Sequence, residues 1–218
     1  KLLIKTSASL IQPVLFADQP IPVTLYLQKA GSADFNPAIS LHLVDEHGRF
    51  FGQSDQYRPA NFPLNRWQPN EYAVDQHQLD ALELTPPGEY TLRLFILNDQ
   101  TGARLNVLNA AGQPIGNSVD LGTITLERGD RNFYSLREWV GQSAEIALDM
   151  QAPLPPTQVG DTIPLTLFWG ALTAAPQQPP VQFVLRDDGG NVILTQPFEP
   201  LNQDFPFTAM REGERWRD

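Results

Sequence analysis

The chain has 218 residues, of which 18% are charged and 41% are hydrophobic, with 20 prolines, 15 glycines and no cysteine. Without cysteine there are no disulfides, thiolate metal sites or cysteine nucleophile, and a net charge of −10 with no basic stripe makes nucleic acid a poor candidate partner. The hydrophobic fraction suffices for packed cores, and the many prolines and glycines favour short strands joined by turns over helices.

Short runs with strand character follow one another along the first 127 residues. The clearest is 89–98, in which large apolar residues occupy every second position, as on the buried face of a strand. A Pro- and Asn-rich stretch, 54–69, is predicted as a long irregular connection. Turn signals about every 8–12 residues are typical of an antiparallel β-sandwich, with a barrel as the alternative. The predicted strands are 1–5, 14–16, 22–27, 39–44, 49–53, 72–77, 89–98, 104–108 and 119–126.

The chain nearly repeats itself at a spacing of 142 residues. The segment 21–26 (IPVTLY) returns as 163–168 (IPLTLF), and 39–45 (ISLHLVD) aligns without a gap with 181–187 (VQFVLRD). A repeat of this length corresponds to a whole domain rather than to a solenoid unit. One added residue aligns a further pair, 71–75 (EYAVD) with 214–218 (ERWRD).

We therefore predict an all-β chain of two tandem antiparallel immunoglobulin-like or fibronectin-like β-sandwich domains. The first and complete domain spans 1–127, a linker spans 128–142, and a second, incomplete copy spans 143–218. Within the linker, 133–140 is the best helix candidate, with an extended lead-in strand as the alternative. Because the chain starts at Lys1 without Met, we expect it to be a piece of a longer protein.

The second copy has no counterpart of 77–126. It therefore lacks matches for the predicted strands 89–98 and 119–126, and half a sandwich leaves an open core face and unpaired strand edges. Three arrangements would resolve this: the missing strands exist outside the given sequence, a neighbouring chain supplies strands by β-augmentation, or the second copy leans on the first.

Several structural motifs gather between Arg66 and Leu126. They are Arg66-Trp67-Gln68-Pro69-Asn70-Glu71 followed by Val74-Asp75, then Pro86-Pro87-Gly88-Glu89-Tyr90-Thr91-Leu92, Thr101-Gly102-Ala103-Arg104-Leu105 and Leu121-Gly122. This pattern resembles the C-terminal extracytoplasmic β-sandwich modules of bacterial (Chloroflexi-type) membrane glycosyltransferases of the protein-mannosyltransferase type. The resemblance covers 1–127 and, more weakly, 143–218.

The resemblance implies an extracytoplasmic, cell-envelope location in which the chain is attached to a membrane protein. It also implies that the parent's catalytic residues lie in its membrane-embedded part, so none is carried over to this chain. Two positions depart from the family pattern. Asn70 stands where Gly is usual, although Asn tolerates the same positive φ, and Phe95-Ile96-Leu97 replaces small residues.

Aromatic residues near the predicted loops are candidate glycan contacts: Trp67, Tyr57 and Tyr72, with Phe62 beside them. Trp67 precedes a Pro turn and could stack on a sugar face. Alternatively it packs at the open end of the sandwich with its indole N–H bonded to a loop carbonyl, and we favour packing because a repeated motif position usually serves the fold. Exposed rings beside polar side chains would support glycan binding, and buried rings would count against it.

Acidic residues offer weaker candidates. Asp45-Glu46, Asp99 and Asp187-Asp188 lie in turns and could bind calcium, but none has the spacing of a known calcium loop and acidic residues favour turns in any case. Glu71 and Asp75 could suggest a glycosidase pair, yet the repeated turn motif already accounts for both.

The three histidines, His42, His47 and His77, suggest neither a metal triad nor a Ser-His-Asp set. We therefore predict no catalytic residues, no cofactor and no metal. The expected function is a non-catalytic extracytoplasmic spacer or interaction domain of a larger cell-envelope or membrane protein, such as a glycosyltransferase. The alternative is a carbohydrate-binding module that presents glycan to a parent enzyme, and a stand-alone glycosidase is a remote third option.

Overall fold

The computed structural model describes residues 2–5, 14–29, 36–68, 72–129, 141–151, 158, 160–178, 180–201 and 204–218. These residues form strands and three short 3-10 helices and no α-helix, so the all-β prediction is confirmed. The helix candidate 133–140 lies outside the described residues. The chain divides into two compact units: Lys1–Leu82 with Glu89–Arg128, and Glu83–Gly88 with Gly129–Asp218.

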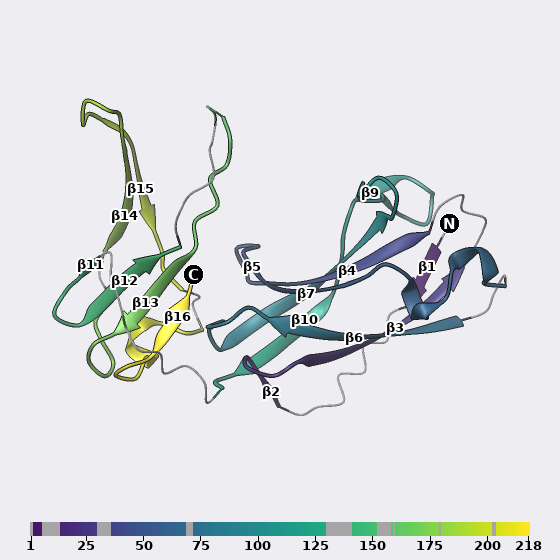
Figure 1. The fold of residues 1–218 in the computed structure, drawn as a ribbon, viewed down its shortest axis with the longest axis horizontal. Coiled ribbons are helices and arrows are strands. Elements are labelled where there is room, and N and C mark those ends of the chain that lie inside the picture. The colour runs from purple at the N-terminus through teal and green to yellow at the C-terminus, as the bar shows by residue number, and fades with distance from the viewer. Residues whose placement is uncertain are drawn as a thin grey trace. The chain divides into compact units, whose positions relative to one another are not determined.

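The first unit is built on one eight-stranded sheet with the order β1-β3-β6-β5-β4-β7-β10-β2 (Figure 1). This sheet is nearly barrel-like, which brings it close to the alternative that the sequence left open. β2 pairs with β10 in parallel. The strands are β1 (Leu2–Lys5), β2 (Leu15–Phe16), β3 (Ile21–Lys29), β4 (Pro37–Val44), β5 (Phe50–Gln56), β6 (Tyr72–Ala81), β7 (Gly88–Asn98) and β10 (Val119–Glu127), beside a small hairpin of β8 (Val107–Leu108) and β9 (Pro114–Gly116).

In this unit, buried residues alternate with more exposed ones along the strands, and the buried residues form the core. On β3, Ile21, Val23, Leu25 and Leu27 are buried while the residues between them are half-buried, because successive strand side chains point to opposite faces. Each such aliphatic side chain contributes about 1.5–3 kcal/mol when fully buried. The same cluster takes in residues of β4, β7 and β10 together with Leu64 and Trp67.

Two sequence predictions for this unit are wrong in part. The stretch 54–69 is not wholly irregular: β5 continues to Gln56, and two 3-10 helices follow, η1 (Pro59–Asn61) and η2 (Leu64–Arg66). The β4–β5 ladder drives this extension, since it runs on to the pair of Ile39 with Gln56. The predicted strand 104–108 is reduced to β8 and an isolated bridge from Arg104 to Leu97.

The second unit contains a four-stranded sheet, β11-β12-β13-β16, and a separate hairpin of two strands, β14 and β15. Its core is rich in aromatic residues and includes Trp169, Phe205, Phe207 and Trp216. A third 3-10 helix, η3 (Phe207–Ala209), supplies part of that core. The strands are β11 (Gly141–Gln142), β12 (Ile146–Met150), β13 (Leu167–Ala171), β14 (Val181–Arg186), β15 (Val192–Phe198) and β16 (Arg215–Arg217).

Two strand pairings recur in the two units with the same register. Leu41 faces Ser54 across β4–β5, and the residues 142 positions later, Phe183 and Gln196, face each other across β14–β15. Both hairpins also shift register at the same place, between Leu43 and Val44 in one and between Leu185 and Arg186 in the other.

The second recurring pairing joins β3 to β6 and β13 to β16. Leu27 faces Ala73, and Trp169 faces Trp216, as the alignment of 71–75 with 214–218 requires. A third pairing differs by two residues between the units, because Ile4 faces Leu27 whereas Ile146 faces Ala171. The repeat thus extends to the pairing of these strands, and the tandem immunoglobulin-like organisation stays a prediction.

Candidate functional site

The first unit contains a hydrogen-bonded row of Ser54, His77 and Asp75. Asp75 and His77 are two residues apart on β6, so both point to the same face of the sheet, and neither side chain is exposed. His77 Nε2 lies 2.9 Å from Asp75 Oδ2, and Ser54 Oγ on β5 lies 3.1 Å from His77 Nδ1. The histidines suggested no Ser-His-Asp set in the sequence, and the fold brings these three residues together; the absence of catalytic residues stays a prediction.

This row differs from the triad of a serine hydrolase in two ways. In that triad the Asp orients Nδ1 and the Ser gives its proton to Nε2, whereas here Asp75 faces Nε2 and Ser54 faces Nδ1. In addition, the ring that would have to pass a proton to a leaving group is completely buried. Both ring nitrogens of His77 therefore have a hydrogen-bond partner, which gives a satisfied internal network.

The other oxygen of Asp75 holds a loop. Ala60 donates its backbone N–H to Asp75 Oδ1 at 2.7 Å. Ala60 follows Pro59 and has a φ of 55°, in the left-handed region that costs a residue with a side chain about 1–3 kcal/mol. A hydrogen bond to a charged acceptor offsets that cost, so the row fixes η1 to β6.

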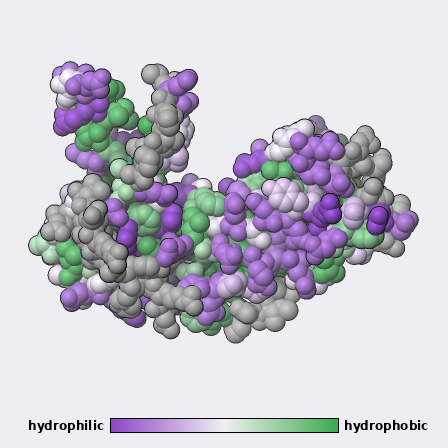
Figure 2. Space-filling model, in the orientation of Figure 1, coloured by the Kyte–Doolittle hydropathy of each residue, from purple (hydrophilic) through white to green (hydrophobic). Residues whose placement is uncertain are grey.

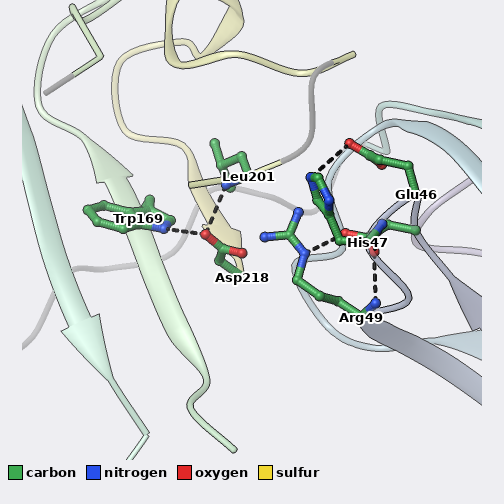
Figure 3. Close-up of polar contacts among 7 residues, drawn as sticks. Glu46, His47, Arg49, Trp169, Leu201 and Asp218 are labelled. Atoms are coloured by element: carbon green, nitrogen blue, oxygen red, sulfur yellow. Dashed lines mark hydrogen bonds and ion pairs between the residues drawn. The ribbon is translucent and has the colours of Figure 1, made fainter. Parts of the chain in front are cut away.

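The second unit repeats this anchor with different surroundings. Leu201 follows Pro200, has a φ of 61°, and donates its backbone N–H to Asp218 Oδ2 at 2.9 Å. The indole N–H of Trp169 donates to the same carboxylate at 3.0 Å, and Figure 3 shows Trp169 and Leu201 converging on Asp218. Asp218 aligns with Asp75, so the carboxylate that clamps a left-handed loop residue is the shared feature, and the His77–Ser54 extension is not shared.

Glu214, four residues before Asp218, stabilises a turn in the second unit. Glu214 is buried, and its Oε2 accepts the backbone N–H of Arg211 at 2.8 Å and the indole N–H of Trp216 at 3.3 Å. Gly213 has a φ of 83° at the position that matches Asn70. Asn70 and Glu71 themselves lie outside the described residues, so the predictions about them stay open.

The two units also share a Phe-Pro motif that was not predicted from the sequence. Phe62-Pro63 and Phe205-Pro206 each introduce a 3-10 helix, η2 and η3, at a spacing of 143 residues. Each helix is followed by a buried residue, Trp67 in one unit and Met210 in the other. The repeated Phe-Pro dipeptide was the available signal for it.

Trp67 lies where the packing alternative places it. It is only 5% exposed, and its indole N–H donates to the carbonyl of Phe62 at 2.9 Å. Lys29 closes the same loop by donating from Nζ to the carbonyl of Trp67 at 3.3 Å. Trp169 and Trp216 are also buried, and Trp139 lies outside the described residues.

Tyr57 and Tyr72 are exposed, at 70% and 52% respectively. Their predicted contact with glycan stays a prediction. No ring contact joins them to each other in the part of the chain that the structure describes.

An aromatic cluster that the sequence did not predict lies on β4, β5 and β7. The ring centroid of His42 is 5.1 Å from that of Phe50 and 4.6 Å from that of Phe95, and the Arg104 guanidinium carbon lies 4.0 Å from the centre of the Phe95 ring. Burial, and then the charge of Arg104, lower the pKa of His42. Both effects favour the neutral form of the imidazole, which suits its position among rings.

The acidic turns use their carboxylates internally. Asp45 Oδ1 accepts the backbone N–H of Arg49 at 2.8 Å, in the turn where Figure 3 labels Glu46, His47 and Arg49. At the aligned position, Asp187 accepts the backbone and side-chain N–H groups of Asn191 at 2.8 and 2.9 Å. The hydrogen bond from the Asn191 side chain is the main reason that the pKa of Asp187 is lowered. These bonds give both turns a role in the hairpin itself.

Among the described residues, no three His, Asp or Glu side chains gather closely enough to hold a metal ion. Within the same part of the chain, no helix has the length and apolar character to cross a membrane. No protein-family model, curated protein or solved structure matches this chain.

Proposed function

We propose that this chain is a non-catalytic β-rich module that serves as a spacer or interaction domain of a larger cell-envelope or membrane protein. The main support is a hydrogen bond that recurs in the two units. Asp75 and Asp218 occupy aligned positions, and each accepts the backbone N–H of a loop residue with left-handed backbone geometry. A carboxylate that makes the same backbone contact in both units serves the fold. Its hydrogen bonds hold a loop in place, which is a structural role and not a catalytic one.

The finer parts of the proposal depend on the motifs. The pattern between Arg66 and Leu126 supports two tandem immunoglobulin-like or fibronectin-like sandwiches, an extracytoplasmic location, and a parent glycosyltransferase of the protein-mannosyltransferase type. The shared registers of β4–β5 with β14–β15 support the duplication within that proposal.

The Ser54–His77–Asp75 row gives the sharpest test of the non-catalytic role. A fluorophosphonate probe labels an activated serine, and mass spectrometry of the treated protein locates the label. We expect no labelling at Ser54 above the level of heat-denatured protein, because His77 is buried and its ring is reversed relative to a triad. Labelling that Ser54→Ala removes and Ser118→Ala leaves unchanged would refute the non-catalytic role.

The exposure of Tyr57 and Tyr72 favours a second function, a carbohydrate-binding module. A glycan array probed with the intact chain tests it. Binding that is lost in Tyr57→Ala or Tyr72→Ala would support this function, with Ile115→Ala as a control because Ile115 is an equally exposed apolar residue on β9. An array without hits would count against it.

A further inference from the structure

We propose that the outer face of β3 and β6 in the first unit binds an uncharged oligosaccharide, which lies along the two strands and stacks on Tyr26 and Tyr72. The inference rests on the carbohydrate-binding function named above as the second candidate, and it specifies the class of glycan and the surface that holds it. It is based on the pairing of the two strands, which places a row of uncharged polar and aromatic side chains on one face of the sheet.

The outer face of these strands is separate from the core. On β6, Asp75, His77 and Leu79 are buried and the residues between them are exposed, because successive strand side chains point to opposite faces. On β3 the residues between the buried ones are half-buried. The outward residues of the two strands lie opposite one another in four pairs: Pro22 with Gln78, Thr24 with Gln76, Tyr26 with Val74, and Gln28 with Tyr72.

None of these paired side chains carries a charge, although the chain has a net charge of −10. The amides of Gln and the hydroxyl of Thr both donate and accept hydrogen bonds, as sugar hydroxyls do. A Tyr ring adds a flat apolar body with a hydroxyl at its end. A charged partner is recognised by groups of the opposite charge, and a polyanion would in addition be repelled by the acidic chain. An uncharged ligand with many hydroxyl groups is therefore the class that these side chains match.

The surface is more polar than the centre of a protein–protein interface. Figure 2 shows that hydrophilic residues make up most of the visible surface of the first unit. On the proposed face, Tyr72 and Val74 are exposed at 52% and 47%, and the exposed β6 residues that follow them are Gln76 and Gln78. Protein partners bury a larger apolar centre, whereas isolated exposed rings among amides suit a sugar.

In the second unit, the matching ring is covered by side chains of that unit. Phe168 aligns with Tyr26, and Arg217 lies opposite Phe168 as Val74 lies opposite Tyr26. The guanidinium carbons of Arg215 and Arg217 lie 4.4 and 5.1 Å from the centre of the Phe168 ring. An aromatic ring at this position of the fold thus presents its face to groups on the outer side of the sheet.

The first unit has different residues at these two positions. The alignment of 71–75 with 214–218 places Tyr72 and Val74 where the second unit has arginines. No cation of a described residue lies over the Tyr26 ring. The ring that the second unit covers with its own arginines therefore has neighbours in the first unit that favour stacking on a sugar.

The buried side of β6 makes this surface rigid. The Asp75 carboxylate holds the backbone of Ala60, and His77 is hydrogen-bonded to Ser54 on β5. β3 and β6 also pair over eight residues. A site on strands that are fixed in this way loses little conformational entropy on binding. From residue 72 to residue 78, β6 extends over about 20 Å, which accommodates several sugar units in a row.

The test uses the whole 218-residue protein and an array of uncharged and acidic oligosaccharides, followed by calorimetry with uncharged gluco- and manno-oligosaccharides of increasing length. We expect hits among the uncharged linear chains. Their affinity should rise with the number of sugar units until the chain covers the four residue pairs. It should not change when salt is added, because no charge pair is involved.

Single variants locate the binding surface. Tyr26→Ala and Tyr72→Ala should each weaken binding about tenfold, and Tyr72→Phe, which keeps the ring, should retain most of it. Tyr57→Ala is the matched control: Tyr57 is an exposed tyrosine that follows β5, outside the four pairs, and its removal should leave binding unchanged. Thermal unfolding followed by circular dichroism checks that each variant is folded.

A second pair of variants uses the arrangement seen in the second unit. Changing Tyr72→Arg together with Val74→Arg places two guanidinium groups beside Tyr26, as Arg215 and Arg217 lie beside Phe168, and should abolish binding. Thr123→Arg adds a positive charge at an exposed position of β10 and should leave binding unchanged.

Binding of uncharged chains that is lost in the Tyr26 and Tyr72 variants and kept in Tyr57→Ala would support the proposal. Hits confined to acidic glycans, or binding that Tyr26→Ala and Tyr72→Ala leave intact, would overturn it. Self-association of the chain that the double arginine variant abolishes would also overturn it, since a second copy would then occupy this face. Binding lost only in Tyr57→Ala would keep the carbohydrate-binding function and reject this surface, whereas an array without hits would count against both.

Discussion

Replacing Asp75 by alanine is the most direct test of the anchor in the first unit. The carboxylate is fully buried and accepts two hydrogen bonds, from the backbone of Ala60 at 2.7 Å and from the His77 ring at 2.9 Å. Each bond to a charged acceptor is worth about 1.5–3 kcal/mol, so two give about 3–6 kcal/mol. Because Ala60 is half-buried rather than fully buried, we expect Asp75→Ala to cost an amount in the lower part of this range, about 3–4 kcal/mol.

Urea unfolding followed by circular dichroism measures this loss, and hydrogen exchange of β3 and β6 amides assigns it to the first unit. Asp80→Ala is the matched control, since Asp80 lies on the same strand with its side chain exposed and should change stability by less than about 0.5 kcal/mol. Asp75→Asn, which keeps one acceptor oxygen, should fall between the two. An Asp75→Ala protein as stable as the Asp80→Ala protein would refute the anchoring role.

Three further predictions follow from other contacts. Asp218→Ala should destabilise the second unit, since it frees the N–H groups of Leu201 and Trp169, and exchange of β13 amides should report the change. Gly52→Ala should cost about 1–3 kcal/mol because its Cβ would meet the β6 backbone, whereas Gly141→Ala has open space and should be nearly neutral in the same urea assay. Because the folded state lowers the pKa of His42 below its ordinary value near 6.5, stability should be full above that value and decline as the pH falls through the lowered pKa. An NMR titration should show that Arg104→Gln raises this pKa while Arg58→Gln does not; an unchanged His42 pKa in Arg104→Gln would contradict the role of that charge.

The sequence predicted those features that depend on local alternation. The run 39–44 shows a period of two, and β4 spans Pro37–Val44. The alignment of 39–45 with 181–187 likewise indicates the shared register of the two hairpins, because a short turn that begins at Asp45 or at Asp187 fixes how the following strand returns.

The Ser54–His77–Asp75 row could not be predicted in this way. Its geometry depends on two residue pairs between β5 and β6, Gly52 with Ala81 and Gln53 with Asp80, which join segments far apart in sequence. Ser54 was predicted to lie in an irregular connection, so its position on a strand beside His77 was not expected. The spacing of Asp75 and His77 on one strand face was the only local sign, and it gives no indication of what lies across the sheet.

Gly52 and Leu194 occupy the same place in the two hairpins, one in each unit. The two hairpins share their register and turn but differ at one position: Gly52 has no side chain and lies close to the β6 backbone, whereas Leu194 carries a side chain that is 51% exposed. This position is therefore one at which the two copies can diverge without a change in the register or the turn that they share.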